Sequence, residues 1–452
     1  MFVEWFIQGE STSIGIGSPV SQQPAKQHTC GRPHCWRLYG FAQAPATMLN
    51  VIIVGAGIAG LSAAISLRRA GHCVHLYEKS SMNDEIGAAI HVPPNASRFL
   101  TAWGLDPVQW HWVEARHADL VDPFTLQPIA ALYKDKSADS VGGLPLWLSH
   151  RVDLHNALKW MATRSDGPGA PATIHLDSLV MALNPWKPSI TLATGREICG
   201  DLVIAADGVH SIAPEAILGR KVVPVDPVNA NYCYRFLIPV ETLEADPETK
   251  FFTEGHWHAT VDIHHVIDTF SDFDDRLLKV ISKATDVKRW PLLYRHPLPT
   301  WSKGRLTLAG DSAHPMLPHQ GQGGAQGLED GLALGIILCG AETPAEIERR
   351  LEVYYTTRHR RTSVIQILSN VGADQADLVR DQLRQYMSDD EIPRDYSEAR
   401  SHNFGFDVVR TTLTAMKDYD PSFRLPDDFF DGPVIGVPGR CKDFVNGGFP
   451  SA

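Results

Sequence analysis

The segment from Val51 to Lys79 is the feature that most constrains how this chain folds. Its sequence, VIIVGAGIAGLSAAISLRRAGHCVHLYEK, places four apolar residues directly before a glycine-rich turn. A short apolar run of this kind is typical of a strand buried on both faces of a parallel sheet. The segment predicts a first strand over residues 51–54, a helix from Ile58 to about Ala70, and a second strand over residues 73–77. We therefore expect an α/β fold built on a Rossmann-like sheet.

The turn itself has the glycine spacing of a dinucleotide site. Gly55 permits the tight turn, Gly57 lets the backbone approach a pyrophosphate, and Gly60 lets the helix pack closely on the strand. The first helical residues, Ile58 and Ala59, bring free N–H groups and the positive end of the helix dipole toward the phosphates. These positions predict a bound dinucleotide.

Two charged residues end the motif. Glu78 follows the second strand, where a carboxylate accepts hydrogen bonds from a ribose, and Lys79 comes next. The motif therefore has every part of a dinucleotide-binding unit: strand, turn, helix, second strand and terminal acid. It does not distinguish NAD from FAD.

A second glycine-rich stretch, residues 304–331, indicates which dinucleotide is bound. Its sequence is GRLTLAGDSAHPMLPHQGQGGAQGLEDG. Residues 305–309 predict a strand that ends in Gly310 and Asp311, and an aspartate there can accept hydrogen bonds from ribityl hydroxyls. The loop that follows opens a helix, and its backbone can lie against a flat ring at Pro318, Gly321, Gly323 and Gly324. Reduced flavin is anionic near N1, so a helix N-terminus at this place favours FAD.

The chain resembles the class A FAD-dependent aromatic hydroxylases, and most closely the salicylate-hydroxylase-like monooxygenases. The resemblance rests on motifs in the family's order between residues 50 and 345. They are Gly55, Gly57, Gly60 and Glu78, then Arg151, then Asp207-Gly208, then Gly310-Asp311 with the loop to Gly324.

This resemblance implies an activity and roles for particular residues. Arg151 would lie along the flavin, Asp207 and Gly208 would contact FAD and a pyridine nucleotide, and Asp311 would bind the ribitol. NAD(P)H would act as a transient reductant, and a C4a-hydroperoxyflavin would hydroxylate a small phenolic or aromatic acid substrate. Two alternatives remain: a non-aromatic secondary metabolite as substrate, or a flavin-binding protein without activity.

Substrate contacts are expected on the strand around residues 231–239. Tyr234 and Arg235 should point to opposite faces of it. Arg235 can pair with a phenolate or carboxylate, although a surface ion pair explains it almost equally well. His319 in the flavin loop is a further candidate, whereas His314 is expected to brace the loop.

The predicted domain organisation is discontinuous. We expect a disordered extension at residues 1–47, an FAD-binding domain at 48–225 with 300–345, a mixed-sheet substrate domain at 226–299, and a C-terminal helical region and tail at 346–452. The substrate domain looks shortened, since only 74 residues separate Arg235 from Gly310, and this shortening is what leaves the inactive alternative open.

Composition excludes several functional classes. The net charge of −11 argues against nucleic acid as a partner. The seven cysteines are scattered and predict no disulfide framework, and no apolar run is long enough to cross a bilayer, so a cytoplasmic protein is expected. We expect it to be a monomer or a homodimer. Two histidine clusters, around His28 to Cys35 and His256 to His265, lack a known metal-ligand pattern, so no metal is predicted.

A basic run on the predicted helix after residue 346 has two readings. Arg358, His359, Arg360 and Arg361 can attract an NAD(P)H phosphate or form a solvated helix face. We favour the solvated face, because runs of like charge on helices usually face water.

Overall fold

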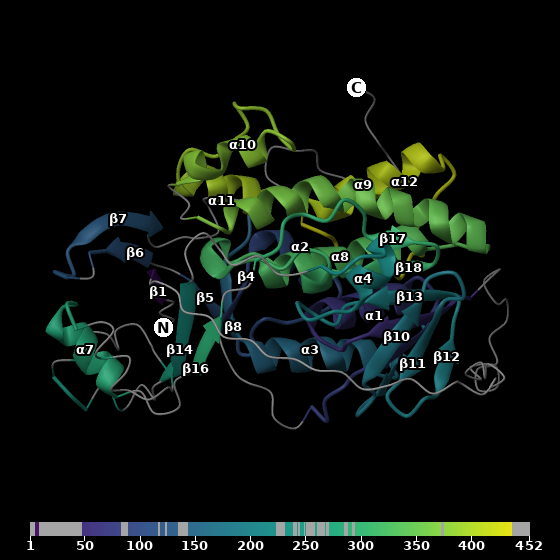
Figure 1. The fold of residues 1–452 in the computed structure, drawn as a ribbon, viewed down its shortest axis with the longest axis horizontal. Helices are drawn as coiled ribbons and strands as arrows, with labels where there is room; N and C mark the ends of the chain where they lie inside the picture. The colour runs from purple at the N-terminus through teal and green to yellow at the C-terminus, as the bar shows by residue number, and fades with distance from the viewer. Residues whose placement is uncertain are drawn as a thin grey trace.

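The computed structural model describes residues 5–8, 48–82, 89–115, 118–122, 124–133, 143–222, 231–237, 271–283, 288–291, 294–371 and 375–435, with a few isolated positions between 242 and 267. Its centre is a six-stranded sheet in the order β17-β18-β13-β2-β3-β9 (Figure 1). The strands are β2 (Asn50–Val54), β3 (Cys73–Tyr77), β9 (Thr173–His175), β13 (Leu202–Ala205), β17 (Ser302–Lys303) and β18 (Leu306–Leu308). Every neighbouring pair is parallel except β17 with β18.

The parallel sheet confirms the expected Rossmann-like core. The predicted helix is α1 (Ile58–Arg69), and the predicted second strand is β3 with the expected bounds. All five residues of β3 and residues 51–54 of β2 are buried, as the apolar run required. Because parallel strands point the same way, their carboxyl ends and the loops that follow meet at one edge of the sheet.

Long helices pack beside this sheet. They are α1, α3 (Arg151–Thr163), α8 (Gly323–Leu338) and α9 (Pro344–Leu368). Helix α1 packs against both α3 and α8, and α9 and α12 (Val408–Tyr419) lie over α8 (Figure 1). The other helices are α2 (Pro94–Ala102), α4 (Ala213–Leu218), α7 (Asp275–Ser282), α10 (Arg380–Leu383) and α11 (Tyr396–Phe404). Short 3-10 helices occur at Gly310–Ser312, Pro318–Gln320 and Ala376–Val379.

Smaller sheets surround the core. One contains β4 (Ala89–Val92), β8 (Trp147–His150) and β5 (Val113–Glu114); another contains β10 (Val180–Asn184), β11 (Ser189–Leu192) and β12 (Glu197–Cys199); and β6 (Ala118–Val121) pairs with β7 (Pro128–Tyr133). A further sheet contains β1 (Trp5–Gln8), β14 (Asn231–Leu237), β15 (His258–Ala259) and β16 (Lys288–Pro291).

Three features of the structure are not specified by the sequence motifs. Residues 5–8 of the predicted extension pair with β14, while residues 9–47 lie outside the described part. The C-terminal region contains α11 and α12, and Asp431 beyond them accepts hydrogen bonds from the buried Arg69 guanidinium at 2.8 and 3.0 Å. Cys73 and Cys199 each take part in a disulfide bond, which the scattered spacing of the cysteines does not predict, and Cys339 is buried and free.

The contact between α1 and α8 depends on small residues. Ser62 and Ser66 of α1 donate hydrogen bonds to the carbonyls of Leu328 and Leu332 on α8, at 2.8 and 3.0 Å. Such short distances between one helix's side chains and the other's backbone require glycine on α8. A Cβ added to Gly335 would lie 1.9 Å from Ser66 Oγ and 2.6 Å from the Ser66 carbonyl carbon. The two helices therefore approach to backbone contact.

We predict that Gly335→Ala destabilises the protein by about 1–3 kcal/mol, because the backbone of α1 must shift to accept the methyl group. The better helix propensity of alanine offsets only part of this cost. Urea denaturation measures the change. The control is Gly432→Ala, whose added Cβ meets no described atom within 4 Å and should change stability by less than about 0.5 kcal/mol. Equal midpoints for Gly335→Ala and the unmodified chain would contradict the close approach.

Candidate functional site

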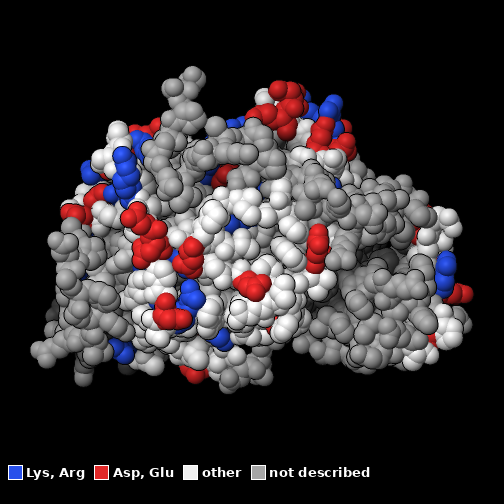
Figure 2. All heavy atoms as spheres, turned by 180° about the vertical axis from the view of Figure 1, so that it is seen from behind, with Lys and Arg blue, Asp and Glu red and all other residues white. Residues whose placement is uncertain are grey.

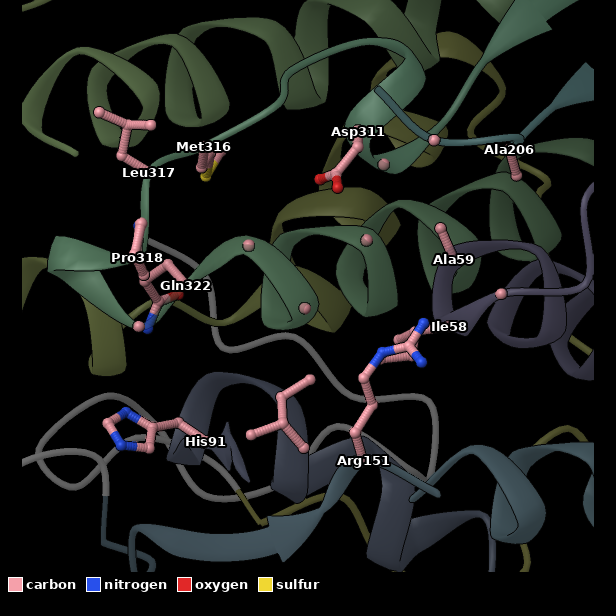
Figure 3. Close-up of a pocket in the computed structure, with 18 of the residues that line it drawn as sticks. Ile58, Ala59, His91, Arg151, Ala206, Asp311, Met316, Leu317, Pro318 and Gln322 are labelled. Carbon is pink, nitrogen blue, oxygen red and sulfur yellow. The ribbon is translucent and has the colours of Figure 1, made fainter. Parts of the chain in front are cut away.

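A cavity of about 500 Å³ lies at the carboxyl edge of the central sheet, where β2, β13 and β18 end. Figure 3 shows that it is elongated, with Ile58, Ala59 and Ala206 at one end and Met316, Leu317 and Pro318 at the other. Both glycine-rich motifs contribute to it, although about 250 residues separate them in the sequence. Among the predicted cofactor residues, those that line it are Gly57, Ile58, Ala59, Arg151, Gly208, Gly310, Asp311, Pro318, Gly321, Gly323 and Gly324.

The N-terminus of α1 opens onto one end of the cavity. Gly55 precedes it with a φ of +93°, and a Cβ there would lie 2.5 Å from the carbonyl oxygen of Ala206, so only glycine fits. Gly57 has no side chain with which to cap the helix, and a Cβ at this position would meet no described atom within 4 Å. The first N–H groups of α1 therefore face an open space that suits a phosphate.

The N-terminus of α8 opens onto the same cavity. Its preceding residue, Gln322, makes no capping hydrogen bond to the helix within the described chain, and the first turn carries no acidic residue. Two uncapped helix N-termini give the cavity a positive potential that favours anionic groups. The site thus suits an elongated ligand with negative charge at both ends.

Asp311 extends into the cavity between these two ends, and the side chain of Arg151 also reaches into the cavity (Figure 3). Asp311 is accessible from the cavity, yet protein surrounds its other sides, and this desolvation raises the pKa of its carboxyl group. The positive charges of Arg295 and Arg151 act against that shift. A carboxylate at mid-cavity is placed to accept hydrogen bonds from a polyhydroxylated chain.

Asp207 lies beside the cavity, next to the lining residues Ala206 and Gly208. Burial raises the pKa of its carboxyl group, while Ser211, Lys79 and Arg295 lower it. Its Oδ1 is buried and has no hydrogen-bond partner among the residues that the structure describes. A buried carboxylate oxygen left in this way points to a bound group that supplies the missing donor.

The remaining residues of the first motif support the turn from behind. Glu78 accepts a hydrogen bond from the backbone N–H of Ala56 at 2.9 Å, between the first two glycines. Gly60 packs against Gly55, since a Cβ there would lie 2.1 Å from the Gly55 carbonyl oxygen. Lys79 is exposed. Gly55, Gly60, Glu78 and Lys79 therefore do not line the cavity, and the first three shape its wall.

A buried ionic network holds the second motif in place. Asp330 on α8 accepts hydrogen bonds from the Gly310 backbone N–H at 2.8 Å, from His314 at 2.6 Å and from Arg358 on α9 at 2.8 Å. Its neighbour Glu329 binds Arg358 and Arg361. All of these side chains are less than a tenth exposed.

The network corrects the expectation of a solvated face on α9. Arg358 and Arg361 are buried ion-pair partners, and His359 binds the carbonyl of Leu298 at 2.9 Å. Arg360 alone of the four is well exposed, at 62% of its side chain, and pairs with Glu391. Arg358 and Arg361 therefore pack against the acids of α8, and only Arg360 fits the solvated face that was expected for this run.

The arginines determine the ionisation of the two acids. Burial alone would raise the pKa of Glu329 and of Asp330, but Arg361, Arg358 and His314 outweigh it and both pKa values are lowered. Because both pKa values are depressed in the folded state, the pairs stabilise the fold above the ordinary carboxyl values of 4.5 and 3.8. That contribution is lost as the pH falls through the lower folded values.

The structure does not test the predicted substrate residues, and His319 is not among the described residues that line the cavity. Tyr234 and Arg235 lie on β14, as expected, but their side chains are outside the described part. His319 lies half-buried in the turn Pro318–Gln320, and burial lowers its pKa. Their roles stay predictions.

Sequence reasoning missed one wall of the cavity. Strand β4 contributes Ala89, Ile90 and His91, and a Cβ on Gly321 would lie 2.6 Å from His91 Nδ1. The local pattern Ala-Ile-His-Val followed by two prolines indicates a strand and a helix start, but not where they pack. Ala206, Met316, Leu317, Gln322 and Gly327 also line the cavity and adjoin predicted positions.

Metal ligands, membrane-spanning helices and surface charge can be described only for part of the chain. Among the described residues, no cluster of three or more His, Cys, Asp or Glu residues can hold a metal ion, and the two histidine clusters noted in the sequence fall largely outside that part of the chain. None of its helices combines the length and the hydropathy needed to span a membrane. Figure 2 shows the described basic side chains interspersed with acidic ones, without one continuous basic patch on that face.

Comparison with known proteins agrees with this geometry. Residues 219–367 match the FAD binding domain family, and residues 53–91 match the NAD(P)-binding Rossmann-like domain family. The chain is 48% identical to the FAD-dependent monooxygenase cfoG of Aspergillus candidus, over 84% of this chain and 98% of that protein. It is 28% identical to 3-hydroxybenzoate 6-hydroxylase 1 of Aquipseudomonas alcaligenes, over 72% and 89%. A salicylate hydroxylase substrate complex has the same fold, with a TM-score of 0.57, 21% identity and coverage of 81% and 98%.

We predict that Arg358→Met destabilises the protein by about 3–5 kcal/mol, because it leaves Glu329 and Asp330 short of a buried counter-charge. Urea denaturation at neutral pH measures the loss. Arg360→Met, two residues along the same helix, removes an exposed pair and should cost less than about 1 kcal/mol. Similar losses in the two variants would show that the buried network does not support the fold.

Proposed function

Because this chain belongs to the FAD-dependent monooxygenases of the class A flavoprotein hydroxylase family, we propose that it uses FAD, NAD(P)H and O2 to hydroxylate a small phenolic or aromatic acid. The single observation that carries the proposal is the elongated cavity built from both glycine-rich motifs. FAD has an anionic pyrophosphate, a polyhydroxylated chain and a flat ring in that order, and the cavity offers a matching feature for each.

We place the three parts of FAD along the cavity as follows. The pyrophosphate lies at the N-terminus of α1, against Gly57. The ribityl chain passes Asp311, whose carboxylate accepts its hydroxyl hydrogens. The ring lies against the turn from Pro318 to Gly324, with its pyrimidine end at the α8 N-terminus. Ser211 and Lys79 flank Asp207, whose buried Oδ1 has its missing donor supplied by the cofactor.

The protein's own residues bind and orient the cofactor. When bound, FAD supplies the redox chemistry, which accepts electrons from NAD(P)H and activates O2. The α8 N-terminus stabilises negative charge at the ring, because its N–H groups and dipole are fixed before reaction. Met316 and Leu317 are apolar residues at the ring end (Figure 3), and Ile90 of β4 also lines the cavity, so that together they limit water near the ring.

The substrate class rests on the strand β14. Arg235 is our candidate for pairing with a phenolate or carboxylate, with Tyr234 and His319 as further candidates. A related protein acts on 3-hydroxybenzoate according to its name, which supports a hydroxylated aromatic acid. The alternatives are a non-aromatic metabolite and a flavin-binding protein without activity.

We predict that Asp311→Ala weakens FAD binding by about 1.5–3 kcal/mol, or roughly ten- to hundredfold, because hydrogen bonds to a carboxylate are lost. Quenching of flavin fluorescence during titration of the apoprotein measures the dissociation constant. The control Asp418→Ala removes an exposed carboxylate on α12 and should leave it unchanged. Full FAD affinity in Asp311→Ala would remove Asp311 from the site.

We predict that suitable phenols stimulate NAD(P)H oxidation and yield a hydroxylated product. We also predict that Arg235→Ala raises the KM for the phenol by about tenfold or more while FAD stays bound. Steady-state kinetics and product analysis measure both. Arg289→Ala is the control, because Arg289 on β16 lies opposite Tyr234 in the strand register and not opposite Arg235. Slow oxidation that no phenol stimulates would favour the inactive alternative, and unchanged kinetics in Arg235→Ala would exclude Arg235.

A further inference from the structure

Arg295 is a buried arginine that neither motif predicts. It lies in the segment 294–301, which precedes β17 and has no regular secondary structure, and the residue is only 3% exposed. Burying a guanidinium is costly unless its N–H groups find acceptors. Here Nη2 has acceptors in two separate loops of the cavity wall, whereas the buried Nε has no hydrogen-bond partner among the described residues.

The guanidinium of Arg295 joins those loops. Its Nη2 donates a hydrogen bond to the carbonyl of Val209, in the loop that follows Asp207 and Gly208. The same nitrogen lies 3.5 Å from the carbonyl oxygen of Asp311. These loops follow β13 and β18, which are neighbours in the sheet, so one side chain spans the carboxyl ends of two adjacent strands.

Helix α9 holds the segment that carries Arg295. Gln366 donates to the Arg295 carbonyl at 2.7 Å, His359 to the Leu298 carbonyl at 2.9 Å, and Tyr355 to the Pro299 carbonyl at 2.8 Å. Three side chains of one helix thus fix the backbone on which the guanidinium depends. Gln366 also donates to the Pro315 carbonyl at 3.3 Å, so the same residue contacts the loop of the second motif.

We propose that Arg295 is a positioning residue of the FAD site, which sets the spacing between the Asp207 loop and the Asp311 turn so that both contact the cofactor. The inference rests on the proposed placement of FAD in this cavity. Arg295 does not line the cavity, so it acts through these two loops rather than by touching the ligand.

The charge of Arg295 supports the same role. It lowers the pKa of both Asp207 and Asp311 against the effect of burial. The other groups that face Asp207 are Ser211 and Lys79, and those that face Asp311 are His314, Arg151 and Asp330. Without Arg295 both acids would stay protonated to a higher pH, and a protonated carboxyl is a weaker acceptor for ribityl hydroxyls.

The chain offers a matched control at the opposite edge of the sheet. Arg305 donates to the Asp201 carbonyl at 3.1 Å and so joins the amino ends of the same two strands, β13 and β18. Arg305→Met therefore removes a similar contact between the same strands, away from the cavity.

The test measures the FAD dissociation constant of the full chain from about pH 5 to about pH 8 for Arg295→Met, Arg295→Lys and Arg305→Met. We expect Arg295→Met to bind FAD about tenfold more weakly. The loss of FAD affinity on acidification, as the two carboxylates are protonated, should occur at a higher pH in this variant. Arg295→Lys should lose less affinity and keep the wild-type pH profile, because the positive charge remains. Amide exchange of the apoproteins should be faster at residues 207–211 and 310–313 in Arg295→Met but not in Arg305→Met.

Two results would overturn the proposal. One is FAD affinity, pH profile and amide exchange in Arg295→Met that match the unmodified chain. The other is an equal loss in Arg305→Met, which would assign the effect to the sheet as a whole. An unmodified chain that binds no FAD would contradict the proposed cofactor placement itself, whereas normal FAD binding without hydroxylation would contradict only the proposed activity.

Discussion

The carboxylate of Asp330 is the group on which the cavity depends. One oxygen binds the backbone of Gly310 and the ring of His314, and the other binds Arg358. Three donors satisfy the hydrogen-bonding capacity of this buried carboxylate, whereas the loss of a donor would leave a buried charge partly unpaired at a large cost in free energy. The positions of Gly310, His314 and Arg358 relative to Asp330 are therefore tightly constrained. Through it α8, α9 and the turn that presents Asp311 become one unit.

The parallel sheet brings to one edge the loops that line the cavity, and the buried ionic network then fixes the Asp311 turn in place. Strands β2, β13 and β18 are adjacent, and their carboxyl ends deliver the first glycine turn, the Asp207 loop and the Asp311 turn to one edge. Small residues then let α8 approach α1 to backbone contact, so that both helix N-termini open onto the same cavity. Sheet order, small residues and buried charge together explain how segments 250 residues apart form one site.

Local sequence predicted the parts whose chemistry is local. Val51 to Gly60 defines a strand, turn and helix by itself, and Gly310-Asp311 ends a strand by itself, so both were predicted at the correct places. The burial of Arg358 and Arg361 was not predicted. Helical periodicity indicates which face of α9 the two residues share, but it does not show that acidic residues of α8 pack against that face. The roles of Arg295 and β4 were not predicted either, because they depend on tertiary contacts with loops that are distant in the sequence.

A crystal structure of the chain with FAD would test the central claim most directly, namely that the two glycine-rich motifs form a single FAD site. We predict the pyrophosphate within hydrogen-bond distance of the α1 N-terminus, the ribityl chain beside Asp311, and the ring against the turn from Pro318 to Gly324. FAD bound elsewhere, or bound with its ring away from that turn, would contradict the account.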